Sequence, residues 1–97
     1  MKILAVCGFG VGSSMVLKMS IEKVLKKLQI NAEVDNTDMS SAKGIDCDVI
    51  FTSEELQEDL KKISKVPVYA IKKYMDIREV EEVIKEFLDY IQFDYRK

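Results

Sequence analysis

Hydrophobic and polar positions follow two different spacings along the chain, and the two spacings alternate. Short segments rich in apolar or β-branched residues predict strands at residues 2–6, 32–36, 48–52 and 66–71. The stretches between them are long enough for crossover helices, so we expect the strands to lie parallel in one sheet. Pro67 has no backbone N–H and therefore favours an edge position for the fourth strand.

Helical spacing of apolar residues marks three longer segments. The first follows Ser14, the second follows a sequence at residues 52–55 that resembles a capping box, and the third follows Asp76, its expected cap. In the polar segment between the second and third strands, Ser40 or Ser41 is a candidate cap for a short additional helix. The three stripes consist of Leu17, Ile21, Val24, Leu25 and Leu28; of Leu56, Leu60 and Ile63; and of Ile77, Val80, Val83, Ile84, Phe87, Leu88 and Ile91.

These elements predict one α/β domain over residues 1–97, with a four-stranded parallel sheet and helices on both faces. This is the flavodoxin-like or Rossmann-like arrangement. Ligands of such open sheets bind beyond the carboxyl ends of the strands, where the strand order reverses. With the first strand at the centre, Cys7 and the residues that follow it are expected at that crevice.

Composition and charge narrow the class of protein. The 97 residues carry 15 Lys and Arg against 17 Asp and Glu, a net charge of −2. This balance disfavours a nucleic-acid partner, which requires a basic surface. No segment approaches the roughly 20 apolar residues that span a bilayer, and the apolar start is too short for a signal-peptide core. We expect a cytoplasmic protein, monomeric and without nucleic-acid partners.

The chain contains two cysteines and no histidine. In the cytosol, Cys7 and Cys47 are expected to be reduced thiols. Without histidine the commonest metal ligand is missing, and we predict neither a metal nor another cofactor. Cys47 lies outside any glycine-rich segment and is interpreted as a small, packed apolar residue.

The segment that follows the first strand carries the candidate chemistry. Alternating glycines allow successive backbone N–H groups to point inward, and such a loop at a helix N-terminus binds anions, as in a phosphatase-like P-loop. Cys7 is the predicted nucleophile, and the same positive field is expected to lower its pKa below the ordinary value of about 8.5. The predicted phosphate-binding residues are Gly8, Phe9, Gly10, Val11, Gly12, Ser13 and Ser14.

Two other functions start from the same segment. A small cysteine-dependent phosphatase has an arginine separated from its cysteine by five residues, but Ser13 stands at that position, so hydrolysis is expected to be weak. A nucleotide-binding domain is suggested by the spacing of the glycines, with Glu33 or Asp35 near a ribose. Ser13 again departs from that pattern, because it replaces the third glycine of G-x-G-x-x-G.

Two further classes lack their characteristic residues. There is no C-x-x-C sequence to form a local redox pair. The third strand ends in Thr52 and Ser53, whereas a receiver domain requires an aspartate there.

At these residues the sequence resembles a known family, the enzyme IIB components of the bacterial sugar phosphotransferase system (PTS), and in particular the ascorbate-type and galactitol-type members. The resemblance begins with Ile3-Leu4-Ala5-Val6-Cys7-Gly8-x-Gly10-x-Gly12-Ser13-Ser14-Met15 and extends to Lys18-Met19. A second and less specific correspondence is Asp48-Val49-Ile50-Phe51-Thr52-Ser53. The likeness covers essentially the whole chain in length and element order.

The resemblance implies a cytoplasmic phosphocarrier. A IIA partner would pass a phosphoryl group from its phosphohistidine to Cys7, and the resulting phosphocysteine would donate it to a sugar bound by the membrane-embedded IIC partner. The carrier would associate with IIC only transiently. The absence of the phosphatase arginine then has a physical reason, since a carrier must hold phosphate without hydrolysing it.

Partner contacts are expected around the same edge of the sheet. Phe9 stands where the ascorbate-type pattern carries a smaller polar residue, and it either contacts a partner or packs beneath the loop. The predicted loops at residues 35–41, 52–54 and 72–75 surround the crevice. Among them, the lysines at positions 72 and 73 either attract a phosphorylated IIA or are solvated charges.

Overall fold

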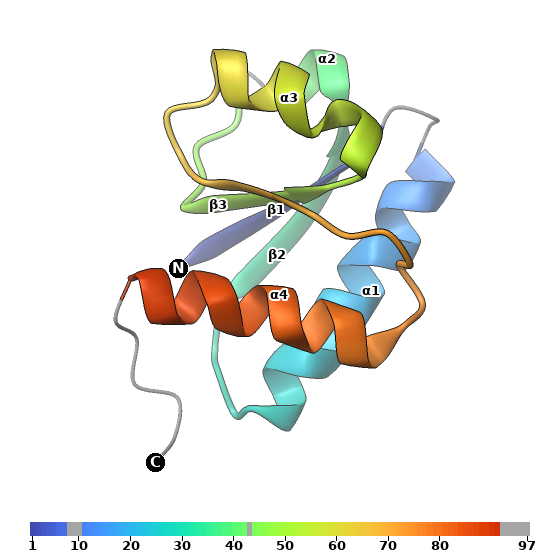
Figure 1. Ribbon diagram of the computed structural model, residues 1–97, viewed down its shortest axis with the longest axis vertical. Coiled ribbons are helices and arrows are strands. Elements are labelled where there is room, and N and C mark those ends of the chain that lie inside the picture. The colour runs from blue at the N-terminus through green and yellow to red at the C-terminus, as the bar shows by residue number, and fades with distance from the viewer. Residues whose placement is uncertain (8–10, 43, 92–97) are drawn as a thin grey trace.

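The computed structural model describes residues 1–7, 11–42 and 44–91 (Figure 1). The predicted alternation of strands and helices is confirmed. In chain order the elements are β1 (Lys2–Cys7), α1 (Val11–Lys27), β2 (Glu33–Asp38), α2 (Met39–Ala42), β3 (Val49–Thr52), α3 (Glu54–Ile63), β4 (Val68–Ala70) and α4 (Ile77–Tyr90).

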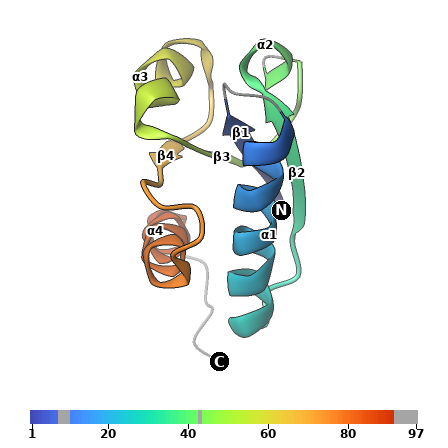
Figure 2. The same ribbon diagram turned by 90° about the vertical axis from the view of Figure 1, so that its right-hand side faces the viewer.

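The four strands form one parallel sheet in the order β2-β1-β3-β4. β1 is an inner strand with a neighbour on each side, and β4 lies at an edge, as Pro67 predicts. Helices α1 and α4 cover one face of the sheet, and α2 and α3 cover the other (Figures 1 and 2). The predicted α/β class, with a parallel sheet between two helical layers, is confirmed.

The side chains of β1 divide the apolar interior into two clusters. Ile3, Ala5 and Cys7 belong to the cluster that includes buried residues of α1 and α4. Leu4 and Val6 belong to the cluster that includes buried residues of α2 and α3. Because successive side chains of a strand point to opposite faces, this division places the Cys7 side chain on the α1/α4 face.

Aromatic packing fixes α4 against the edge of the sheet. The ring centroids of Phe51 on β3 and Phe87 on α4 are 6.4 Å apart in an edge-to-face arrangement. Tyr69 on β4 lies 5.8 Å from Phe51 and 6.1 Å from Phe87. Because β4 is parallel to β1 and β3, the connection between β4 and α4 begins at the carboxyl end of the sheet, where β1 and β3 also end.

The strand boundaries differ from the expected ones by one or two residues. β2 continues to Asp38 instead of ending at Asn36, because its parallel pairing with β1 extends as far as Cys7. β3 and β4 are shorter than predicted, with bounds Val49–Thr52 and Val68–Ala70. A strand ends where its neighbour no longer offers hydrogen-bonding groups, and a single sequence does not contain that information.

Helix caps were only partly predictable. Asp76 caps α4 as expected. The prediction that Ser40 or Ser41 caps α2 is wrong, because Asp38 Oδ1 accepts the Ser41 N–H at 2.8 Å and the Ser40 hydroxyl at 2.9 Å. Ser53 is the N-cap residue of α3, but its side chain makes no capping hydrogen bond, so the expected capping box does not form.

Loss of the α4 cap provides a test of this fold. Asp76 Oδ1 accepts the backbone N–H groups of Arg78 at 3.1 Å and Glu79 at 3.4 Å. We expect Asp76→Ala to lower the free energy of unfolding by about 1 kcal/mol, because donors of the first helical turn lose their acceptor. Asp76→Asn should retain most of that stability in urea denaturation. An unchanged free energy for Asp76→Ala would contradict the assignment of this cap.

Candidate functional site

Cys7 is the last residue of β1, at the carboxyl end of the sheet. Its side chain is 2% exposed and belongs to the α1/α4 cluster. The neighbouring strand β3 ends at Thr52, whose buried hydroxyl donates to the Val6 carbonyl at 2.7 Å. The backbone next to Cys7 is therefore fixed from both sides, by the pairing of β1 with β2 and β3 and by this hydrogen bond.

A tyrosine hydroxyl lies against the Cys7 sulfur. Cys7 Sγ donates a hydrogen bond to Tyr74 Oη over 3.4 Å. Tyr74 lies between β4 and α4, and its half-buried ring packs against the α1/α4 cluster. Ser53, directly after β3, also forms a side-chain hydrogen bond with Tyr74 that lowers its pKa. The sulfur and the two hydroxyl groups form the polar part of the described site.

The sequence did not single out Tyr74. Its loop was expected near the crevice, but Cys7 and Tyr74 are 67 positions apart in the chain. In the sequence, Tyr74 could have been noticed only as a tyrosine that follows shortly after the fourth predicted strand. Such a position does not by itself place the hydroxyl beside Cys7, because the path of the loop is not known from the sequence.

The expectation of a lowered Cys7 pKa is wrong for the site as described. Burial raises the pKa of the Cys7 thiol above its ordinary value, and the hydrogen bond with Tyr74 lowers it by less. The physical reason is that a thiolate loses hydration in the apolar α1/α4 cluster. The positive field of a glycine loop is visible in the sequence, whereas the packing of α1 and α4 over the thiol is visible only in the fold.

The predicted phosphate-binding segment is described only in part. Gly8, Phe9 and Gly10 lie outside the described residues. The remaining positions, from Val11 to Ser14, form the first turn of α1, which begins three residues earlier than predicted. The first backbone N–H groups of a helix have no acceptor within it, so this turn has the donors that anion binding requires.

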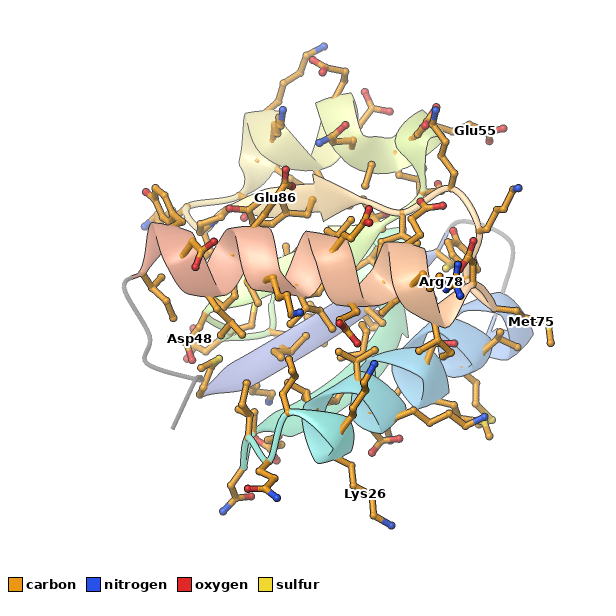
Figure 3. The ribbon with its side chains drawn as sticks, turned by 60° about the horizontal axis from the view of Figure 1, so that its bottom comes forward. Lys26, Asp48, Glu55, Met75, Arg78 and Glu86 are labelled. Atoms are coloured by element: carbon orange, nitrogen blue, oxygen red, sulfur yellow. The ribbon has the colours of Figure 1, made fainter. Side chains whose placement is uncertain are left out.

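Cys47 lies at the opposite end of the sheet. The Asp48 N–H donates to the Lys2 carbonyl at 2.8 Å, and the Lys2 N–H donates to Asp48 Oδ2 at 2.7 Å, so this segment meets the beginning of β1. Figure 3 shows Asp48 and Met75 at opposite ends of the molecule. The half-buried Cys47 packs against the α2/α3 cluster, as its interpretation as a packed residue predicts.

The acidic residues proposed for nucleotide binding do not reach the carboxyl end of the sheet. Glu33 pairs with Lys2 and Asp35 with Leu4 in the β1–β2 register, both before the end of β1. The Asp35 carboxylate also lies 3.3 Å from Lys2 Nζ. The structure therefore does not bring Glu33 or Asp35 together with Cys7.

Asp38 is the carboxylate that pairs with Cys7 in the strand register. The Ser41 N–H and the Ser40 hydroxyl bind it and lower its pKa. A carboxyl group with a lowered pKa is ionised at neutral pH and is not a proton donor to a leaving group. Asp38 thus lacks the property required of the general acid of a phosphatase.

Exposed apolar side chains lie near the site. Met75 is 81% exposed and follows Tyr74, and Figure 3 shows it at the end of the molecule where α1 begins. The first half of α1 carries exposed Met15, Val16 and Met19. Nearby, Lys72 Nζ lies 3.5 Å from Glu54 Oε1, which partly neutralises one of the two lysines considered for partner attraction.

Within residues 1–7, 11–42 and 44–91, no helix has the length and apolar character needed to cross a membrane. The same ranges contain no group of three or more His, Cys, Asp or Glu side chains placed to hold a metal ion.

The fold and the site define a small α/β protein with a cysteine at the carboxyl end of an inner parallel strand. Residues 2–86 match the family model described as "PTS system, Lactose/Cellobiose specific IIB subunit". The chain is 31% identical over 88 residues to the "Ascorbate-specific PTS system EIIB component" of Mycoplasma pneumoniae, which covers 89% of this chain and 93% of that protein. The chain therefore belongs to the family of PTS IIB components, the sugar phosphotransferases that the sequence resembles.

A solved structure supports the same fold. The lactose-specific IIB component domain of the PTS from Streptococcus pneumoniae matches this chain with a TM-score of 0.58 and 17% sequence identity. The match covers 99% of this chain and 98% of that domain. At this identity the likeness concerns the fold alone.

The raised thiol pKa values predict a loss of stability in alkali. Burial is the largest cause of the raised pKa at both Cys7 and Cys47. A pKa that is higher in the folded than in the unfolded state stabilises the protein below the unfolded pKa, and this contribution is lost as the pH rises through the folded value. The free energy of unfolding should therefore fall as the pH rises above about 9.

Serine does not titrate in this range, so Cys7→Ser and Cys47→Ser should each flatten that decline. Urea denaturation from about pH 8 to pH 10 measures the decline in the free energy of unfolding. The change of this free energy with pH is compared between the variants and the parent protein, not its absolute value. Tyr69 and Tyr74 also have raised pKa values and add the same trend from about pH 10 upward. Parallel curves for both variants and the parent protein would contradict the assigned burial of the thiols.

Proposed function

We propose that this chain is a PTS IIB phosphocarrier that takes a phosphoryl group onto Cys7 and passes it to a sugar. The observation that carries the proposal is the position of Cys7, whose thiol ends the inner strand β1 just before the first turn of α1. Sulfur is an effective phosphoryl acceptor, and free helical N–H groups stabilise the charge of a phosphoryl group. Membership of the IIB family supports the same reaction.

The proposed reaction divides the chemistry between sulfur and backbone. Cys7 supplies the attacking atom and forms a phosphocysteine. Backbone N–H groups from Gly8 to Ser14, with the Ser13 and Ser14 hydroxyls, bind the phosphoryl oxygens. Phosphoryl transfer depends mainly on alignment and on neutralising the oxygens, so these roles suffice without a metal or another cofactor.

The proposed partners are a IIA protein as phosphohistidine donor and a membrane-embedded IIC protein that binds the sugar. We place this chain in the cytoplasm as one monomeric domain over residues 1–97, in transient contact with IIC. The name of the Mycoplasma pneumoniae relative favours an ascorbate-type system over a galactitol-type one. IIC holds the sugar in this scheme, so sugar choice belongs mainly to that partner.

Exposed methionines near Cys7 suit a carrier with two partners. Donor and acceptor must approach the same sulfur in turn, so their contact surfaces on this chain overlap. Methionine has a flexible, polarizable side chain that adapts to different surfaces. We propose that Met15, Met19 and Met75, with Phe9, form part of this shared contact surface.

The first test compares the two cysteines. After incubation with phosphoenolpyruvate, the general PTS proteins and a IIA protein, Cys7→Ser should take up no detectable phosphate, because a serine hydroxyl is a far weaker nucleophile at neutral pH. Cys47→Ser is the matched control and should take up one phosphate at the parental rate. Intact-protein mass spectrometry measures both.

Retained phosphate uptake by Cys7→Ser would refute the proposed carrier. The two variants should have the same fold by circular dichroism, because each exchange replaces only one sulfur by oxygen. A loss of uptake in both variants would place the effect outside the Cys7 site and would also count against the proposal.

The phosphatase alternative predicts a different activity. Ser13 replaces the arginine of the phosphatase pattern, and Asp38 is an ionised cap with a lowered pKa. We expect the purified protein to hydrolyse an aryl phosphate no faster than its Cys7→Ser variant. Turnover that depends on Cys7 would favour the phosphatase over the carrier.

A further inference from the structure

We propose that Tyr74 is a catalytic residue of the transfer at Cys7, whose hydroxyl donates a hydrogen bond to the sulfur whenever that sulfur is a thiolate. This proposal rests on the proposed phosphocarrier function. The Cys7 thiol forms a 3.4 Å hydrogen bond with Tyr74 Oη, and no other residue is assigned a polar contact with this sulfur in the described part of the chain. When the thiol loses its proton, the same pair of atoms remains bonded with the hydroxyl as donor.

The position of Tyr74 is fixed by the loop that carries it. The Ile71 N–H donates to the Thr52 carbonyl at 2.8 Å, which attaches the start of the loop to β3. The Asp76 N–H donates to the Lys73 carbonyl at 3.0 Å, and the Asp76 side chain caps α4. The ring of Tyr74 packs against the α1/α4 cluster. The hydroxyl is therefore held in place before the reaction, as preorganised stabilisation of charge requires.

Tyr74 keeps its proton at neutral pH. Burial, then the hydrogen bond with Cys7 and then the Cys7 charge together raise the pKa of Tyr74 to about 12. Among its other neighbours, Glu55 on α3 raises this pKa and the Ser53 hydroxyl lowers it. The nearby Lys72 is engaged by Glu54 through its ammonium group. Tyr74 thus acts as a hydrogen-bond donor to a thiolate and not as a base.

The proposed role applies to both halves of the reaction. In the first, an electron pair of the Cys7 thiolate forms the S–P bond, and the P–N bond of the donor phosphohistidine breaks with its electrons on the imidazole nitrogen. The thiol releases one proton when it ionises, and the imidazole nitrogen takes up one proton, so the step is balanced. In the second, a sugar hydroxyl oxygen forms the O–P bond, its proton passes to solvent, and the S–P electrons return to sulfur. Tyr74 stabilises the thiolate as nucleophile and then as leaving group.

The test measures the Cys7 pKa in Tyr74→Phe, a variant that removes only the hydroxyl. In a Cys47→Ser background, the NMR signal of 13Cβ-labelled cysteine reports Cys7 alone. A hydrogen bond to a charged group is worth a shift of about one pH unit, so the Cys7 pKa should rise by about that much. Tyr69→Phe is the matched control, because Tyr69 lies in the same cluster but packs against Phe51 and Phe87. It should leave the Cys7 pKa unchanged.

The rate of phosphate uptake gives a second readout. At pH 7, Tyr74→Phe should react about three- to tenfold more slowly, because its thiolate fraction is smaller while its thiolate is slightly more nucleophilic. The deficit should shrink as the pH rises. A defect of packing alone would lower the rate equally at every pH.

An unchanged Cys7 pKa in folded Tyr74→Phe, or a rate deficit independent of pH, would overturn the proposal. If Tyr74→Phe fails to fold, Ser53→Ala replaces it. That variant removes a hydrogen bond that polarises the Tyr74 hydroxyl, so a smaller increase in the Cys7 pKa is expected, and no increase would equally overturn the role of Tyr74. The titration needs no partner protein, so its failure is distinct from a failure of the parent protein to accept phosphate.

Discussion

The burial of β1 between two helical layers is the constraint on which the site depends. Residues from Ile3 to Cys7 are all buried, so alternate side chains of this strand are committed to opposite apolar clusters. A shift of one residue in its register would exchange the two sets. The same alternation turns the Cys7 thiol toward α1 and α4, and toward the loop that carries Tyr74. The position of the Cys7 thiol, the proposed nucleophile, is thus a consequence of how the core is divided.

The burial of Cys7 helps to orient its sulfur but opposes the formation of the thiolate. Contact with the α1/α4 cluster orients the sulfur but raises its pKa, because a buried thiolate is poorly solvated. A phosphocarrier needs the thiolate as nucleophile and again as leaving group. Local hydrogen-bond donors reconcile the two, since they favour the charged sulfur without opening the core. In the described structure Tyr74 Oη accepts from the Cys7 thiol, and we propose that it becomes such a donor once the thiol has lost its proton. The first turn of α1 has backbone N–H groups without an acceptor inside the helix, which can bind the phosphoryl oxygens.

The sequence was sufficient for features that local pattern determines. A short apolar run followed by glycines placed Cys7 at the carboxyl end of an inner strand, and the long stripe from Ile77 to Ile91 located α4. The start of α1 was misplaced because Val11 and Gly12 are weak helix formers. The cap of α2 was misassigned because aspartate and serine both cap helices, and spacing does not distinguish Asp38 from its neighbours.

The site depends on features that local pattern does not determine. The contact of Cys7 with Tyr74 joins residues 67 positions apart, and it forms because the loop between β4 and α4 packs its tyrosine against the α1/α4 cluster that contains Cys7. The sign of the Cys7 pKa shift depends on the same packing. Family membership was visible from the glycine and serine pattern after Cys7 and is confirmed by the matches along the chain.

The most direct test of the account is the chemical nature of the bond to phosphorus. The unmodified protein would be phosphorylated by the general PTS proteins with a IIA protein and observed by 31P NMR, which distinguishes phosphorus bound to sulfur from phosphorus bound to oxygen. We expect one protein-bound signal of the S–P type, which disappears when a membrane fraction containing IIC and its sugar is added. A signal of the O–P type, from one of the serines beside Cys7, would contradict it.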